Sequence, residues 1–139
     1  MKKWLPLVLA GCFALMAAVS CKKAIEKKAE NMIMDAITNG QWIVEQYFEG
    51  SNNISSQFLN YTFQFNSNGT VTGNINNTAT PGTWSANTTD YTITSSFPNT
   101  GDPLQKLNGV WKIKDSDWDY VKAVMTTATG ADTLILRKK

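Results

Sequence analysis

The chain has 139 residues, of which 42% are hydrophobic and 17% charged, a composition that predicts one folded domain rather than a disordered chain. Its formal charge of +2 includes Lys2 and Lys3, and without this pair the remaining 11 basic residues balance the 11 acidic ones. A net charge of zero argues against nucleic acid as a partner. There is no histidine, and the two cysteines are Cys12 and Cys21. We therefore predict no enzymatic activity, no catalytic residue, no metal site and no cofactor.

Residues 1–20 have the pattern of a lipoprotein signal peptide. Lys2 and Lys3 precede an apolar run from Trp4 to Val19, and Ala18-Val19-Ser20-Cys21 resembles a bacterial lipobox. We expect cleavage before Cys21 and lipidation of this residue, because several acyl chains anchor a protein stably. The partner of this anchor is a lipid bilayer, which places the protein in the cell envelope, on the periplasmic side of a membrane or at the cell surface.

Two alternatives for this N-terminus stay open. Leu9-Ala10-Gly11-Cys12 also matches a lipobox, although its apolar run is shorter than the roughly 7 residues that a signal requires. An uncleaved membrane anchor is the other alternative, since the run from Trp4 to Ser20 is just under the roughly 20 residues of a span. Each of them still tethers the domain to a membrane.

Residues 21–39 are predicted to form a tether, helical from Lys22 to Thr38. Its apolar residues recur at helical spacing on one face: Ile25, Ala29, Met32, Ile33, Ala36 and Ile37. Asn39-Gly40 supplies the stop, because both residues tolerate a left-handed backbone. The helix is either a solvated spacer or a segment that closes one mouth of the following domain.

Residues 40–139 are predicted to form an all-β domain, because the hydrophobic period changes to two after Gly40. The predicted strands are Gln41–Phe48, Gln57–Phe65, Thr70–Ile75, Gly82–Ala86, Tyr91–Ser96, Leu107–Lys114, Tyr120–Thr127 and Asp132–Arg137. Residues 66–69 form a hairpin turn, and residues 76–81 form a longer connection. Short connections favour antiparallel neighbours, so we expect an eight-stranded up-and-down barrel.

Alternation along these strands predicts an inner face rich in aromatic residues. The residues expected to line an interior ligand site are Phe63, Phe65, Trp84, Tyr91, Ile93, Trp111 and Met125. Leu134 and Leu136 are expected to face inward from the last strand. This set is either an ordinary core or the wall of a cavity for a small apolar ligand.

The order of several short motifs resembles the lipocalins, and in particular the lipocalin-like domains of small bacterial lipoproteins. These motifs are Gly40-Gln41-Trp42, residues 61–65 with Asn68-Gly69-Thr70-Val71, Gly82-Thr83-Trp84, residues 107–113, and Leu134-Ile135-Leu136-Arg137. The resemblance implies an antiparallel barrel in a non-enzymatic protein that holds a lipophilic ligand. It also implies that Arg137 lies over Trp42 in a cation–π contact.

Acidic residues suggest two further sites. Asp115-Ser116-Asp117-Trp118-Asp119 is similar to the start of a calcium loop but lacks its later glycine and glutamate, so an acidic hairpin turn is the simpler interpretation. Glu45 and Glu49 could form a carboxylate pair, although no cleft is evident around them.

Two functions follow from these patterns. The first is a membrane-anchored, lipocalin-like lipoprotein that binds a small hydrophobic ligand or lipid. The second is an envelope structural or protein-interaction module with a solid barrel core, whose protein partner the sequence does not identify. A cavity below about 300 Å³ would favour the second function.

Overall fold

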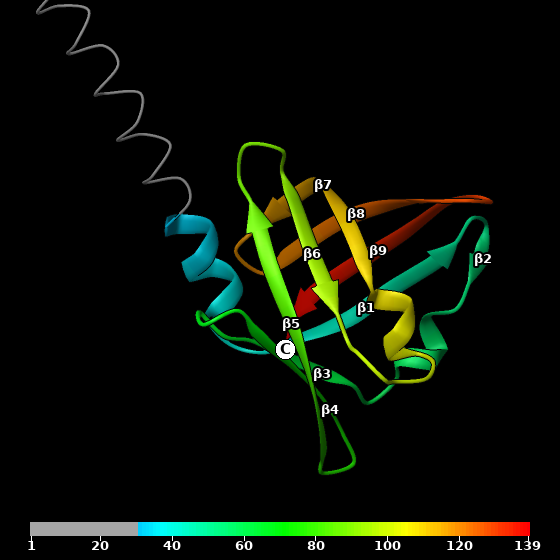
Figure 1. The fold of residues 1–139 in the computed structure, drawn as a ribbon, viewed down its shortest axis with the longest axis horizontal. Helices are drawn as coiled ribbons and strands as arrows, with labels where there is room; N and C mark the ends of the chain where they lie inside the picture. Colours follow the sequence, from blue (N-terminus) through cyan, green and yellow to red (C-terminus); the bar gives the residue numbers. More distant parts are fainter. Residues whose placement is uncertain (1–30) are drawn as a thin grey trace, which may run out of the picture. The chain divides into compact units, whose positions relative to one another are not determined.

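The computed structural model describes residues 31–139, and residues 34–139 form one compact unit, a closed eight-stranded antiparallel barrel (Figure 1). This confirms the predicted fold class. Within the described residues the strands are β1 (Trp42–Glu49), β2 (Asn52–Asn53), β3 (Thr62–Phe65), β4 (Thr70–Ile75), β5 (Thr78–Asn87), β6 (Thr92–Ser96), β7 (Gly109–Asp117), β8 (Tyr120–Thr127) and β9 (Gly130–Lys138). The predicted signal peptide, Cys21 and most of the tether lie outside this range.

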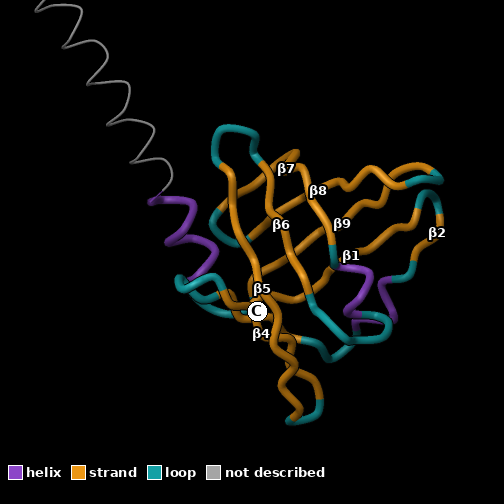
Figure 2. Tube along the Cα trace, in the orientation of Figure 1, coloured by secondary structure: helices purple, strands orange, loops and turns teal. Residues whose placement is uncertain are grey.

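The sheet follows the chain order and is closed by its ends. Each strand from β3 to β8 pairs with the next one, and β9 pairs with β1 over seven residue pairs, from Trp42↔Lys138 to Glu49↔Asp132. On its other side β1 meets β3 through Trp42↔Phe63. The two-residue strand β2 pairs back onto the end of β1. Figure 2 shows the strands as one continuous winding sheet.

One hairpin is tighter than the sequence predicted. The expected connection over residues 76–81 is wrong, because Asn76 and Asn77 alone make the turn and β5 begins at Thr78. Both asparagines have positive φ, 49° and 62°, as a two-residue type I′ turn requires. Pro81 lies within β5 opposite Thr72, and β6 pairing starts only at Thr83, so no ladder hydrogen bond to β6 is lost at the proline.

Two predicted strand ends are 3₁₀ segments instead, namely η1 (Ser55–Phe58) and η2 (Leu104–Leu107). Each segment ends at a buried apolar residue, Phe58 in η1 and Leu107 in η2. Both segments contact Tyr47 near the end of β1: its ring stacks on Phe58, and its hydroxyl donates to the carbonyl of Lys106. They therefore cover the same end of the barrel.

The barrel interior is packed largely with aromatic and branched side chains. Trp42, Tyr47, Phe58, Phe97 and Val71 are the largest of the fully buried side chains among the described residues. The chain also comes close to itself at Gly82, where a Cβ would lie 2.6 Å from the carbonyl oxygen of Ser96. Glycine is therefore required at this β5–β6 contact.

At the other end of the barrel lies the last turn of a helix over residues 31–38. Ile37 is buried, and its carbonyl accepts a hydrogen bond from Nε1 of Trp42 at 2.9 Å. Gly40 has φ +85°, which confirms that it breaks the helix as predicted. Among residues 31–139, no helix combines the length and hydrophobicity that crossing a bilayer takes.

Candidate functional site

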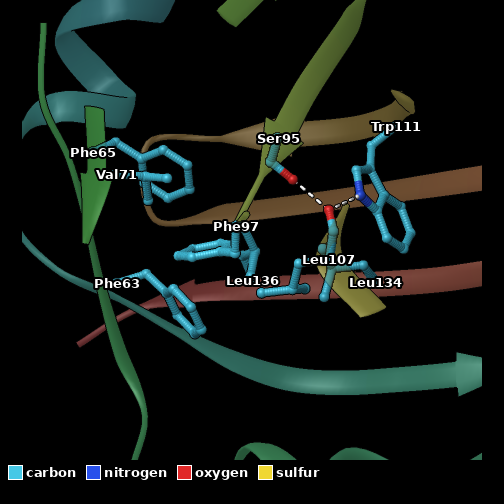
Figure 3. A pocket seen from close by; sticks show the side chains of 9 residues that line it. All are labelled: Phe63, Phe65, Val71, Ser95, Phe97, Leu107, Trp111, Leu134 and Leu136. Carbon is cyan, nitrogen blue, oxygen red and sulfur yellow. Dashed lines mark hydrogen bonds between the residues drawn. The ribbon is translucent and has the colours of Figure 1, made fainter. Parts of the chain in front are cut away.

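The candidate site is an apolar cavity inside the barrel, drawn in Figure 3. Its volume is about 40 Å³. The lining residues come from β3, β4, β6, the β6–β7 connection, β7 and β9: Phe63, Phe65, Val71, Ser95, Phe97, Leu107, Trp111, Leu134 and Leu136. Ligand pockets for small molecules usually have about 300 Å³ or more, whereas about 10–15 Å³ of this kind of volume suffices for one water molecule.

The polar atoms at the cavity wall are already bonded to the protein. The carbonyl of Leu107 accepts hydrogen bonds from the Ser95 hydroxyl and from Nε1 of Trp111, the latter at 2.9 Å (Figure 3). Among the described residues, no buried side-chain nitrogen or oxygen atom is left without a partner. The cavity therefore offers a molecule inside it little beyond dispersion contacts.

Three of the predicted ligand-site residues, Phe63, Phe65 and Trp111, line the cavity. Trp84 is buried next to Phe65, with the two rings edge to face at 5.4 Å, and its Nε1 donates to the Asn66 carbonyl. The two other interior candidates, Ile93 and Met125, are half-buried and lie outside the cavity wall.

The predicted interior position of Tyr91 is wrong. Its side chain is 59% exposed, and its backbone has φ +53°. The residue belongs to the β5–β6 turn, where a left-handed conformation takes it out of the strand and ends the side-chain alternation. Only its carbonyl continues the sheet, by accepting a hydrogen bond from the amide of Ile113 at 2.8 Å.

The predicted contact of Arg137 with Trp42 is also wrong. The guanidinium lies 4.8 Å from the ring centroid of Tyr120 and pairs with Glu45 at 3.1 Å, on the outside of the barrel. Nζ of Lys138 lies over Trp42 instead, 5.3 Å from the ring. The reason is register: Lys138 is the direct partner of Trp42, whereas Arg137 is opposite Ile43 and points to the other face.

The acidic run from Asp115 to Asp119 lies at the hairpin between β7 and β8. Within residues 31–139 there is no cluster of three or more His, Cys, Asp or Glu side chains arranged to hold a metal ion. Asp115, Asp117 and Asp119 line an open surface hollow together with Arg137. Asp117 accepts a hydrogen bond from the amide of Trp118, as in an ordinary hairpin turn.

The other predicted carboxylate pair is separated. Glu45 pairs with Arg137 on the outer face, while Glu49 pairs with Lys106 at 2.6 Å near the mouth covered by η2. The bond to Glu49 is the main cause of the raised pKa of Lys106. Both carboxylates are thus explained as ion-pair partners.

Several cavity residues were not among the predicted ligand set. Ser95 and Phe97 continue the inward alternation of Ile93 and could have been found by extending that strand. Leu107 was expected on the inner side of the strand Leu107–Lys114, and it is buried as expected, but it reaches the interior from a 3₁₀ segment rather than from a strand. Tyr47 is fully buried, yet its hydroxyl reaches the carbonyl of Lys106 at 2.7 Å, and no local pattern signals this contact.

The described residues therefore define a closed antiparallel barrel with a small apolar interior cavity. No protein-family model matches the chain, and no curated protein matches its sequence. The structure is similar to the crystal structure of a DUF4847 family protein from Bacteroides vulgatus, with a TM-score of 0.56 at 15% sequence identity. The similar region covers 77% of this chain and 97% of that protein, and at this identity it shows the fold alone.

Proposed function

We propose that this chain is a membrane-tethered envelope module that carries no resident lipid and acts through the outer surface of its barrel. The observation that carries the proposal is the cavity volume of about 40 Å³, well below the roughly 300 Å³ of typical ligand pockets. Of the aromatic residues that suggested a ligand site, Trp111 packs edge to face against Tyr47 at 5.8 Å and Phe65 packs edge to face against Trp84 at 5.4 Å, so these rings fill the interior against other rings.

The tether in this proposal is the lipid on Cys21, and the bilayer is its partner. The support is the sequence Ala18-Val19-Ser20-Cys21 after an apolar run. The module would sit on the periplasmic side of a membrane or at the cell surface and would not be an enzyme. Its resemblance to lipocalins would then concern the fold rather than the carriage of a ligand.

Native mass spectrometry of protein purified from its own membrane tests the absence of a resident lipid. The expected mass is the processed chain plus its covalent acyl groups at Cys21 and nothing more. A stoichiometric noncovalent lipid would refute the proposal. The test needs gentle detergent extraction, so that a bound lipid would survive purification.

The anchor has its own test, with a matched control within the chain. Cys21→Ala should release the protein from the membrane fraction or stall its processing. Cys12→Ala should leave membrane attachment and acylation unchanged, since this cysteine lies inside the predicted signal. Retention of the Cys21→Ala protein as a processed membrane species would contradict the anchor.

A further inference from the structure

Residues 97–108, which connect β6 to β7, form a self-contained loop. Their regular backbone hydrogen bonds stay inside the segment, from Gln105 to Gly101, from Lys106 to Pro103 and from Asn108 to Gln105. Its two ends are clasped by the Asn108 side chain, which accepts from the amide of Phe97 at 2.6 Å and donates to its carbonyl. Twelve residues with joined ends have the organisation of an Ω-loop.

The loop is attached to the barrel by side-chain bonds concentrated on two consecutive residues of η2. The carbonyl of Lys106 accepts a hydrogen bond from the Tyr47 hydroxyl at 2.7 Å, and Nζ of Lys106 pairs with Glu49 at 2.6 Å. The carbonyl of Leu107 accepts the hydrogen bonds from the Ser95 hydroxyl and from Nε1 of Trp111. In the described part of the chain, no backbone–backbone hydrogen bond joins residues 98–107 to a strand. The loop can therefore leave without breaking the β-ladder.

Three apolar side chains of this loop fill the mouth of the barrel. Phe97, Leu104 and Leu107 are all buried, and Phe97 and Leu107 form part of the cavity wall. Leu104 packs against Gly73 on β4, where an added Cβ would lie 3.2 Å from its Cδ2. Withdrawal of these side chains would join the existing cavity to the space that they occupy and to solvent.

We infer that residues 97–108 are a lid, latched at Lys106 and Leu107, which opens as a unit and admits a small uncharged apolar molecule to the barrel interior. The ligand class follows from the wall, which offers carbon surface apart from Ser95, Nε1 of Trp111 and the Leu107 carbonyl, and these three groups are bonded to one another. The inference goes beyond the proposed function, which concerns the closed barrel. A resident lipid would refute that function without bearing on the lid.

Hydrogen exchange of the full chain in detergent micelles, followed by mass spectrometry, tests the opening. Peptides from residues 97–108 should exchange through an opening that is insensitive to low denaturant, while β8 peptides exchange only by global unfolding. Tyr47→Phe removes the fully buried latch hydroxyl and should raise the lid exchange rate about tenfold. Val121→Ala, at a buried position on β8, is the control: it should lower global stability without selectively speeding the lid.

Binding of the neutral fluorescent probe N-phenyl-1-naphthylamine measures access. In a micelle-free preparation of the chain in lipid nanodiscs, its apparent affinity should rise by the same factor as the lid-open population, about tenfold for Tyr47→Phe. The proposal is overturned if lid and β8 amides of the wild-type chain exchange with the same denaturant dependence. It is equally overturned if faster lid exchange leaves probe binding unchanged. The comparison of lid and β8 exchange in the wild-type chain tests the opening of the lid even if Tyr47→Phe does not fold.

Discussion

Trp42 joins the helix over residues 31–38 to the barrel, and its replacement by phenylalanine should cost about 2–3 kcal/mol of unfolding free energy. The side chain is 1% exposed, and its Nε1 donates to the carbonyl of Ile37. This carbonyl is one of the last four of the helix, which have no partner within it. Leaving a buried acceptor unpaired costs about 1–2 kcal/mol. The smaller ring adds about 1 kcal/mol through lost packing and a weaker contact with Lys138.

Thermal unfolding followed by circular dichroism measures this loss. For a domain of this size 1 kcal/mol corresponds to about 4 °C in Tm, so the Trp42→Phe midpoint should fall by about 8–12 °C. The matched control is Trp118→Phe, at the tip of the β7–β8 hairpin. Trp118 also faces Nζ of Lys138, at 6.0 Å, but is 53% exposed, and its replacement should stay within about 0.5 kcal/mol.

A double-mutant cycle separates the two contributions to the Trp42 effect. Lys138→Met removes the cation, and the coupling energy between the two sites gives the part of the cation–π contact that is lost when phenylalanine replaces the indole, expected at about 0.5–1 kcal/mol. The remainder belongs to the hydrogen bond and the packing. If Trp42→Phe destabilises the chain no more than Trp118→Phe does, the assignment of Trp42 as the junction between helix and barrel is refuted.

Three further results are expected. Gly82→Ala should lower the free energy of unfolding, measured in urea, by about 1–3 kcal/mol, because its Cβ would meet the Ser96 carbonyl. Gly101→Ala should leave this free energy unchanged, because no atom lies within 4 Å of a Cβ at that position. Burial raises the pKa of Tyr47, so above about pH 10 this tyrosine ionises in the unfolded chain before it ionises in the folded one. The free energy of unfolding should therefore fall as the pH rises above about 10, and it should fall less in Tyr47→Phe. Leu134→Ala should cost about 2–5 kcal/mol and create xenon binding detectable by crystallography, since the enlarged cavity stays apolar.

For the last strand, the alternation of side chains predicted the inward-facing residues better than the family resemblance did. Leu134 and Leu136 were expected to face inward, and alternation then places Lys138, not Arg137, on the side of Trp42. The lipocalin pattern suggested the arginine, and the register between β1 and β9 decided against it. Hydrophobic periodicity gave the strands Thr70–Ile75 and Tyr120–Thr127 with their observed bounds.

The cavity could not be predicted in the same way, because its size depends on side chains that meet only in three dimensions. Leu107 reaches the interior from a 3₁₀ segment and meets Leu134 from β9 there. A pattern of period two identifies an inner face but not how completely that face is filled. The aromatic content therefore predicted a ligand site where the packed structure leaves about 40 Å³.

The pairing of β1 with β9 also constrains the order of events during synthesis. Strand β1 pairs with β9, which is synthesised after all the other described strands, and until Gly130–Lys138 is available β1 and β8 each keep an unpaired edge. Open edges recruit strands from other molecules, and closure over so long a loop is slow. A premature stop within these last nine strand residues should therefore yield an aggregation-prone open sheet rather than a slightly shorter barrel.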